Sequence, residues 1–346
     1  MSIIYSQSGG LNNAAIGKLE TPLKMIIEHE SDAQAKRGGI RDWLFNVEKS
    51  RRFGETIVGQ NEFGVFTAAE EGAAAEADGL QETYKKFIEH IQFMKEFTIT
   101  ANMMEDANYG VAADARRRAE NFTRAYYKTM HRICEHALAN GTYATATFAK
   151  AVVDLTAPDG LPLFSASHKW GPAENGGTQS NYFASGEVGG LFGSTTAFED
   201  ALGVLASKIR NMKDENGDVL GYTADTIILP GNRPAAEAIA KKVCGSDGAL
   251  GNGYNDINLQ YGNWNIVIMP DWQCNDDRVM VMSSEANKNL AGNMFFNRVP
   301  LTISNWIDNP TGNFKWSGRC RFGVGFGNYK HILLAVDGTA EGATTL

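Results

Sequence analysis

The sequence is poor in cysteine, and the cysteines that it has are far apart. Its 346 residues include only Cys134, Cys244, Cys274 and Cys320, and no two of these form a CxxC pair. Disulfide frameworks and structural zinc sites are built from closely spaced sets of cysteine and histidine. We therefore expect buried free thiols, without a disulfide or a zinc site.

The chain also lacks an excess of basic charge. Its 32 lysines and arginines are outnumbered by 40 aspartates and glutamates, which gives a formal net charge of −8. Domains whose main task is to grip nucleic acid are usually strongly basic, so the composition argues against that class of protein. It does not argue against a protein that encloses nucleic acid without binding it sequence-specifically.

Long apolar runs are missing as well. No stretch approaches 18 consecutive apolar residues, and the first residues, MSIIYSQSGG, contain neither a basic leader nor the apolar core of a signal peptide. At 43% hydrophobic residues, the chain can nevertheless fill sizeable cores. The expectation is a soluble, folded protein made in the cytoplasm.

No residue pattern predicts catalysis or metal binding. Ser165 and Ser167 lie beside His168, but residues adjacent in sequence seldom form a catalytic triad, and there is no GxSxG motif. His131 and His136 are five residues apart on a predicted helix, where a shared metal face needs a spacing of three or four. We expect no enzyme activity, no metal and no cofactor.

Two other motifs resemble ligand-binding loops only in part. The glycines of Gly323-Val-Gly-Phe-Gly327 precede a strand-like run, whereas a dinucleotide-binding glycine loop must open a helix. Glycine-rich strands that allow a close approach explain them better. The segment Asp214–Asp218 begins like a calcium loop but lacks the remaining ligands and the closing glutamate, so a turn is expected.

The most informative feature that is present is one long amphipathic helix, predicted over residues 106–139. Its apolar residues recur every three or four positions and form one packing seam. At about 1.5 Å per residue it would be roughly 50 Å long, whereas a compact globule of this chain length has a radius of gyration of only about 20 Å. The subunit is therefore expected to be flat or elongated. The seam consists of Ala112, Ala115, Ala119, Phe122, Tyr126, Met130, Ile133 and Ala137.

Two appendages precede this helix. Residues 1–52 look like an arm with a short helical pattern at residues 19–28 and too few apolar residues for a core of their own, so they need another surface to lie on. Residues 53–95 are interpreted as an out-and-back β-hairpin that leads into a strand before the helix. The return segment is ambiguous, because a helical spacing also fits Leu80, Tyr84, Phe87, Ile88 and Ile91. A lone two-stranded hairpin is marginal in water, which implies a partner surface.

The candidate interface residues lie on these two appendages and on the helix. Aromatic and apolar residues would anchor neighbouring copies, and the helix arginines would form salt bridges with them. Contact of the arginines with DNA is the alternative, which the negative net charge disfavours. The candidates are Trp43, Phe45, Phe53, Ile57, Val58, Phe63, Val65, Phe66, Arg117 and Arg124.

The rest of the chain mixes helices and strands, so we expect an α+β protein. A strand-like run follows the long helix, and Thr195 or Thr196 is expected to cap a second helix. Beyond Tyr222 a compact α/β unit is predicted, with a helix at residues 234–243 and strands at residues 226–230, 264–269, 279–282 and 291–298. Strands at residues 301–307, 320–326 and 330–336 end the chain.

The order of these parts resembles a known family. The resemblance is carried by Asp159–Phe164 followed by His168, by Asp214–Gly221 leading into Ala224–Pro230, and by Arg319–Gly323. These segments are similar to those of the major capsid proteins of tailed bacteriophages, within them the Mu-like major head subunit group with the Hong-Kong-97-type fold. The resemblance implies an N-terminal arm (1–52), an extended loop (53–95), a peripheral domain with the spine helix (96–221), an axial domain (222–300) and C-terminal strands returning to the peripheral domain (301–346).

The resemblance also implies a function. Such subunits form hexamers and pentamers that tile an icosahedral head around double-stranded DNA, assembled in the host cytoplasm, with a portal protein and, in some cases, decoration proteins. Only about fifty residues precede the extended loop, so we expect a separate scaffolding protein. The sequence has no lysine between Phe53 and Tyr84, and we therefore expect no lysine-to-asparagine cross-link from this loop.

Two other functions remain open at this point. One is a related shell, an encapsulin-like nanocompartment of the same fold that encloses cargo enzymes. The other is an oligomeric α+β enzyme, which the absence of an acid, base, metal or phosphate constellation disfavours.

Overall fold

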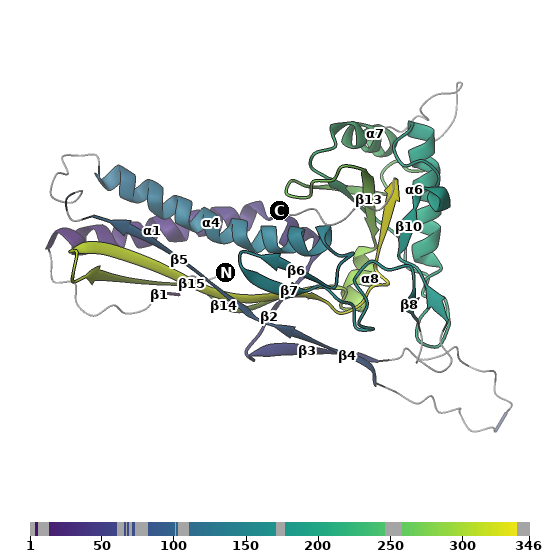
Figure 1. Cartoon of the computed structure of the whole chain (residues 1–346), viewed down its shortest axis with the longest axis horizontal. Coiled ribbons are helices and arrows are strands. Elements are labelled where there is room, and N and C mark those ends of the chain that lie inside the picture. Colours follow the sequence, from purple (N-terminus) through teal and green to yellow (C-terminus); the bar gives the residue numbers. More distant parts are fainter. Residues whose placement is uncertain are drawn as a thin grey trace.

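In the computed structural model the chain forms an elongated body, and the long helix α4 (Val111–Ala139) runs along one half of it (Figure 1). The structure describes residues 4–5, 14–60, 66, 68, 71–72, 82–100, 102, 111–170, 177–245 and 258–337. The 29 residues of α4 span about 43 Å. The helix ends at Ala139 as predicted, whereas residues 106–110 of its expected start lie outside the described residues.

A long mixed sheet lies below α4 (Figure 1). The strand order is β1–β14–β15–β5, and β2 also pairs with β14. The predicted strands at 291–298 and 301–307 form one 16-residue strand, β14, whose register shifts between Asn297 and Thr302. Pro300 lies in this interruption, where its missing N–H breaks no regular ladder. The strands are β1 (Ile4–Tyr5), β2 (Asn46–Lys49), β5 (Ile91–Ile99), β14 (Asn293–Asp308) and β15 (Asn313–Phe326).

The apolar seam of α4 packs on this sheet, as the sequence predicted. Ala119, Met130 and Ile133 have no exposed surface. The ring of Phe122 lies 5.3 Å from that of Phe97 on β5, and it is so close to Gly318 on β15 that a Cβ there would collide with it. Every other residue of β15 therefore faces the helix, and the intervening residues point to the opposite face of the sheet.

The N-terminal arm lies on the chain's own α4. Helix α1 (Ala14–Arg37) is much longer than the predicted pattern, and it runs alongside α4 (Figure 1). Leu23 and Ile27 are buried against it, and the hydroxyls of Ser31 and Tyr127 are 2.8 Å apart. The sequence suggested that the arm needs another surface, and the structure supplies that surface within the same subunit. The short helix α2 (Ile40–Leu44) then leads into β2.

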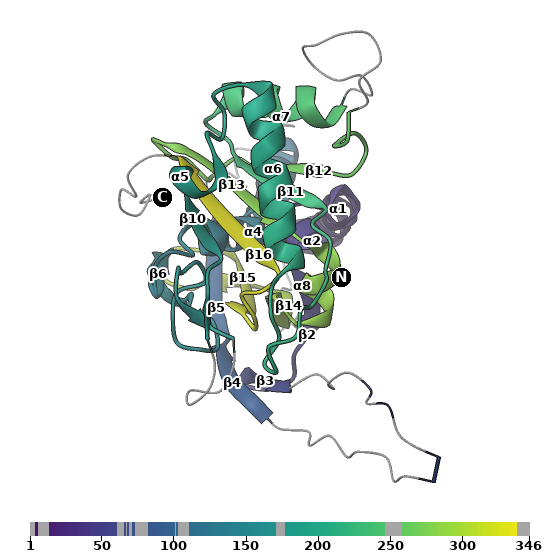
Figure 2. The same cartoon turned by 90° about the vertical axis from the view of Figure 1, so that its right-hand side faces the viewer.

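A second sheet forms the other half of the body, in the order β10–β16–β13–β11–β12. Helices α6 and α7 cover one of its faces (Figure 2). Helix α6 is capped by Ser194, whose Oγ accepts a hydrogen bond from the N–H of Ala197 at 3.0 Å, and not by Thr195 or Thr196 as predicted. The elements are β10 (Tyr182–Ala184), α5 (Ser185–Val188), α6 (Thr195–Arg210), β11 (Thr226–Pro230), α7 (Pro234–Gly245), β12 (Asn265–Met269), β13 (Asp277–Met282), α8 (Ser284–Asn289) and β16 (Ile332–Asp337).

Two elements lie on the other side of the predicted domain boundaries. Helix α6 was assigned to the 96–221 segment, yet Phe198, Leu202 and Leu205 share a core with β11 and α7. Strand β16 was expected to return to the long sheet, yet it pairs with β13 in the second sheet. Both errors arise because sequence proximity does not determine which core an amphipathic element covers. The boundaries at 52, 95, 221 and 300 otherwise stay predictions.

Three small hairpins complete the described part. The predicted extended loop contains β3 (Gly54–Gln60) paired with β4 (Glu82–Glu89), but Ile91–Lys95 already belong to β5 in the long sheet. The other pairs are β6 (Thr145–Phe148) with β7 (Ala151–Asp154) and β8 (His168–Lys169) with β9 (Thr178–Gln179).

Among the helices of the described residues, none has the length and apolar character to span a bilayer.

Candidate assembly surfaces

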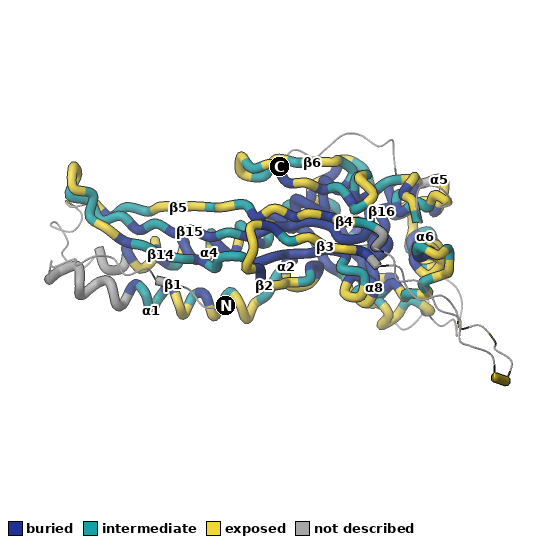
Figure 3. Tube along the Cα trace, turned by 90° about the horizontal axis from the view of Figure 1, so that it is seen from below, coloured by how far each residue is buried: buried dark blue, intermediate teal, exposed yellow. Residues whose placement is uncertain are grey.

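The stem of the β3–β4 hairpin is seated on a row of glycines in β15. The stem crosses the long sheet on the face opposite α4 (Figure 3). A Cβ on Gly325 would lie 2.6 Å from Cδ1 of Ile88, and one on Gly323 would lie 2.8 Å from the carbonyl oxygen of Glu89. A Cβ on Gly327 would likewise meet Ile57. The interpretation of this motif as strand glycines that permit close approach is confirmed.

Polar contacts fix the same stem. The Nζ of Lys86 is buried and donates to Oδ2 of Asp154 and to Oγ1 of Thr156, each at 2.5 Å. Burial alone would raise the pKa of Asp154, but the hydrogen bonds from Lys86 and Thr156 outweigh it and lower that pKa. On the other edge, Nδ2 of Asn328 donates to the Tyr84 hydroxyl at 3.1 Å. These contacts therefore fix the hairpin stem on the body of the subunit.

The predicted interface residues of the hairpin are partly exposed. Phe53 is 61% exposed and Val58 is 38% exposed, whereas Ile57 packs against Ile88 and its neighbours. Phe66 is fully exposed, and Phe63 and Val65 lie outside the described residues. Sequence reasoning missed Phe87, which is 50% exposed and stacks on Phe53 with ring centroids 6.4 Å apart. The alternation of Lys85, Phe87 and Glu89 on one face of β4 could have revealed it.

The predicted interface residues elsewhere differ in their surroundings. Trp43 is 57% exposed, but Phe45 is buried in the subunit's own core. Arg117 pairs with Asp114 at 2.9 Å on the same helix. Arg124 donates from Nε to Glu30 of α1 at 2.7 Å, and this hydrogen bond is the main reason that the pKa of Glu30 is lowered. In the subunit, Arg124 thus fastens the arm to α4.

His168 is a structural residue. It is fully buried and stacks on Tyr329, with Nδ1 2.7 Å from Oδ2 of Asp159 and Nε2 3.0 Å from the Leu163 carbonyl oxygen. Both ring nitrogens therefore face acceptors, and neither is directed at a serine.

The described residues contain no group of three or more metal-ligand side chains. The Asp214 loop is a turn, in which Oδ1 of Asp214 accepts hydrogen bonds from the N–H groups of Asn216 and Asp218.

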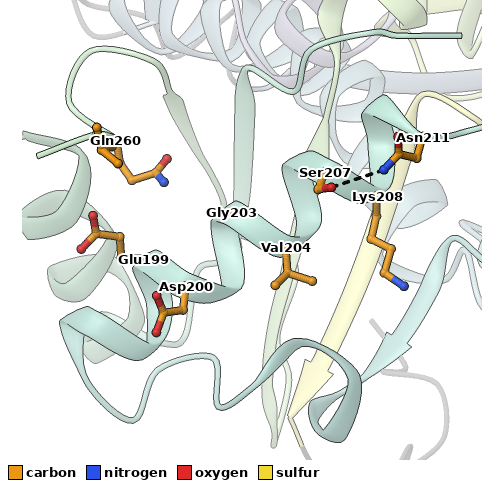
Figure 4. A pocket seen from close by; sticks show the side chains of 9 residues that line it. Glu199, Asp200, Gly203, Val204, Ser207, Lys208, Asn211 and Gln260 are labelled. Atoms are coloured by element: carbon orange, nitrogen blue, oxygen red, sulfur yellow. Dashed lines mark hydrogen bonds between the residues drawn. The ribbon is translucent and has the colours of Figure 1, made fainter. Parts of the chain in front are cut away.

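One groove lies on the outside of α6 (Figure 4). Its volume is about 880 Å³, and Gly203, Val204 and Leu259 form its apolar part. Glu199 and Asp200 lie toward one end and Lys208 toward the other, and the Ser207 hydroxyl accepts a hydrogen bond from Asn211 at 3.3 Å. Among the residues that line it, no nucleophile–base pair is seen.

The subunit is elongated (Figure 1), and the stem of its hairpin is held on the long sheet. A family model described as phage capsid protein matches residues 92–335, which is more than half of the chain. The chain belongs to the phage capsid protein family. A search of the curated proteins finds no match.

Solved structures resemble this capsid protein in fold. The capsid of Myoviridae phage XM1 is 12% identical, with 86% of this chain and 92% of that chain covered and a TM-score of 0.51. The capsid of cyanophage P-SCSP1u is 9% identical, with 88% and 89% covered and a TM-score of 0.49. A virus-like particle from Pyrococcus furiosus is 8% identical, with 90% and 98% covered and a TM-score of 0.47. The predicted α+β, Hong-Kong-97-type fold is confirmed.

The family model makes this chain a phage capsid protein, which is a component of the virion that associates with copies of itself in the capsid. The nanocompartment alternative is less well supported, because the family model describes phage capsids.

A buried carboxyl joins α4 of the capsid protein to its second sheet. Oε2 of Glu135 accepts a hydrogen bond from the N–H of Asp271 at 2.9 Å, and Arg132 contacts the carboxylate of Asp271 at 2.5 and 2.7 Å. Burial, with the nearby charge of Asp271, raises the pKa of Glu135 to about 7 against these stabilising contacts. Burial therefore favours the protonated form of this carboxyl.

The Glu135→Gln variant should be more stable than the wild type in alkaline solution. Because the folded pKa lies above the unfolded one, the contribution of Glu135 is fully present below about pH 4.5 and is lost as the pH rises through 7. Glutamine keeps the acceptor, so we expect a gain of about 2 kcal/mol at pH 8 and almost none at pH 5. Denaturant unfolding at both values measures this. The exposed Glu28→Gln substitution should show no such difference between the two pH values, and equal gains at both would contradict the assignment.

Proposed function

We propose that the chain assembles as hexamers and pentamers in which the β3–β4 hairpin of each copy lies across a neighbouring copy. The observation that carries this is the seating of the stem on Gly323 and Gly325. The stem is held against the long sheet of its own subunit, and exposed Phe53 and Phe87 lie at its base. A neighbour would cover these rings and pair the edges that one subunit leaves open.

The proposal includes the contents and partners of the shell. The head encloses double-stranded DNA without sequence-specific contacts, in keeping with the net charge of −8. Assembly takes place in the host cytoplasm with a separate scaffolding protein and a portal protein, and decoration proteins bind afterwards where a phage has them. The subunit itself has no catalytic role.

Purified protein tests this directly. Size-exclusion chromatography and electron microscopy should show rings of five and six copies or closed shells, and particles from infected cells should contain nuclease-protected DNA. Shells filled with a protein cargo would instead favour the nanocompartment. Small homogeneous oligomers that never form rings or shells in any condition tested would contradict the proposal.

Replacing residues 61–81 by a two-residue Asn-Gly turn, which can still connect the paired residues Gln60 and Glu82, should leave a folded subunit that cannot assemble. The stem keeps its contacts with β15 and Asp154, so the melting temperature should stay close to that of the wild type. The contacts made by the segment on a neighbour would be lost. A Gly/Ser linker of equal length is the matched control for loop length, and it should fail as well. Normal shells from either variant would refute the role given to the hairpin.

A further inference from the structure

Arg298, Arg319 and Arg321 lie on the face of the long sheet that α4 does not cover, and the exposed Arg51 and Arg52 follow β2 at the same corner of the sheet. Arg319 and Arg321 alternate along β15 with Gly318, which faces α4, so their side chains lie on the opposite face. Nε of Arg298 donates to the carbonyl oxygen of Arg52 at 3.0 Å, and the guanidinium of Arg321 lies 5.2 Å from the centre of the Phe53 ring. Both side chains thus converge on the corner between β2 and β3. We call Arg51, Arg52, Arg298, Arg319 and Arg321 the arginine patch.

The arginine patch has no carboxylate partner among the described residues. The structure gives none of the five guanidinium groups an ion pair there, whereas Arg116, Arg117 and Arg124 of α4 each have one. The nearby carboxylate of Glu55 accepts a hydrogen bond from Ser50 at 2.6 Å instead. Like charges gathered without counter-charges repel each other, and in a chain with more acids than bases this arrangement points to an external anionic ligand.

The same chain contains a segment of opposite charge. Residues 61–81, NEFGVFTAAEEGAAAEADGLQ, carry five carboxylates and no lysine or arginine. They connect β3 to β4, at the end of the hairpin opposite to the arginine patch. The seven residues of β3 separate the arginine patch from the start of this segment by roughly 20 Å.

We propose that the arginine patch of one copy binds the acidic segment 61–81 of a second copy. This rests on the proposed function and names the surface that receives the hairpin. Phe53 lies within the arginine patch, and Met94, 64% exposed, lies beside it, opposite Arg319 on β5, so the surface offers apolar contact as well as charge. Guanidinium groups form paired hydrogen bonds with carboxylates, which gives the contact a defined geometry.

Nucleic acid is the less suitable ligand for this surface. Glu96 is exposed on β5 opposite Ser317, and Asp308 flanks Lys315 at 3.6 Å on the same face. These carboxylates would repel a phosphate backbone that ran along the sheet. A short acidic peptide can contact the arginines without lying over the carboxylates of Glu96 and Asp308.

A peptide of residues 61–81 with a fluorescent label tests the proposal by anisotropy against the full-length chain. We expect binding that weakens with added salt, and about tenfold weaker binding to the Arg51→Glu/Arg319→Glu variant. Arg37→Glu, an exposed change on α1, is the matched control and should bind like the wild type. A peptide whose five acidic residues are replaced by lysine should bind the double variant better than it binds the wild type.

Three outcomes would overturn the proposal. They are equal binding to the wild type and the double variant, no binding of the acidic peptide at low salt, and binding of a DNA oligonucleotide at the patch where the peptide does not bind. The readout does not depend on shells. A wild type that binds the peptide but never assembles would therefore count against the proposed function alone, while normal shells without peptide binding would count against the arginine patch alone.

Discussion

Replacing Gly325 by valine is expected to displace the hairpin stem and to abolish shell formation. The added atoms would occupy the space of the Ile88 side chain, since even a Cβ there would lie 2.6 Å from Cδ1 of that residue. The strand cannot retreat, because Phe322, Val324 and Phe326 pack against the core on its other face. Overpacking of this kind costs about 1–3 kcal/mol. The larger effect is on assembly, because the close contact between Gly325 and Ile88 positions the hairpin stem on the sheet.

Gly190→Val is the matched control for this substitution. A Cβ at Gly190 would meet nothing within 4 Å, so the same added side chain should leave stability and assembly unchanged. Thermal melting of the subunit and electron microscopy of particles measure the two effects separately. A Gly325→Val protein that forms normal shells would show that the contact between Gly325 and Ile88 does not position the hairpin.

Acid should destabilise the subunit through His331. This ring is fully buried between the two sheets, with Nε2 2.9 Å from Oδ1 of Asn293. Burial lowers the pKa of His331 to about 3, although a backbone hydrogen bond with Asn328 acts in the opposite direction. The folded pKa lies below the unfolded one, so the contribution is fully present above about pH 6.5 and is lost as the pH falls toward 3. The loss should be on the order of 4 kcal/mol over that range.

The His331→Gln variant separates this effect from general acid unfolding. It should be less stable than the wild type at pH 7, where it loses shape complementarity, but its stability should fall less steeply between pH 6.5 and 4. Denaturant unfolding across that range gives both slopes. The exposed His29→Gln variant should follow the wild-type curve. If the slopes of His331→Gln and the wild type coincide, the acid sensitivity arises elsewhere.

The elements whose apolar residues repeat regularly could be predicted from sequence. The end of α4, its packing seam and the strands β11, β12 and β13 follow from periodicity and turn residues, because a helix or strand in contact with a core must repeat at its own period. The glycines of β15 were also interpreted correctly. The resemblance in motif order then gave the family, which the family model confirms.

The partners of each element could not be predicted in this way. Nothing local distinguishes a helix that packs on the long sheet from one that packs on the second sheet, so α6 and β16 were assigned to the wrong half. The same limit applies to the candidate interface. Phe45 and Phe53 are alike in sequence, yet one is buried and the other is exposed.

The sequence by itself determined the end of the spine helix, the α+β class and the family, because periodicity and motif order are local properties of the chain. Only the tertiary structure decided that the arm lies on the subunit's own α4 and that the hairpin stem is seated on Gly323 and Gly325. It alone brought five arginines from three segments of the chain to one corner of the long sheet. These features depend on contacts between residues far apart in the chain, and the physical forces that select such contacts act on the whole packed core.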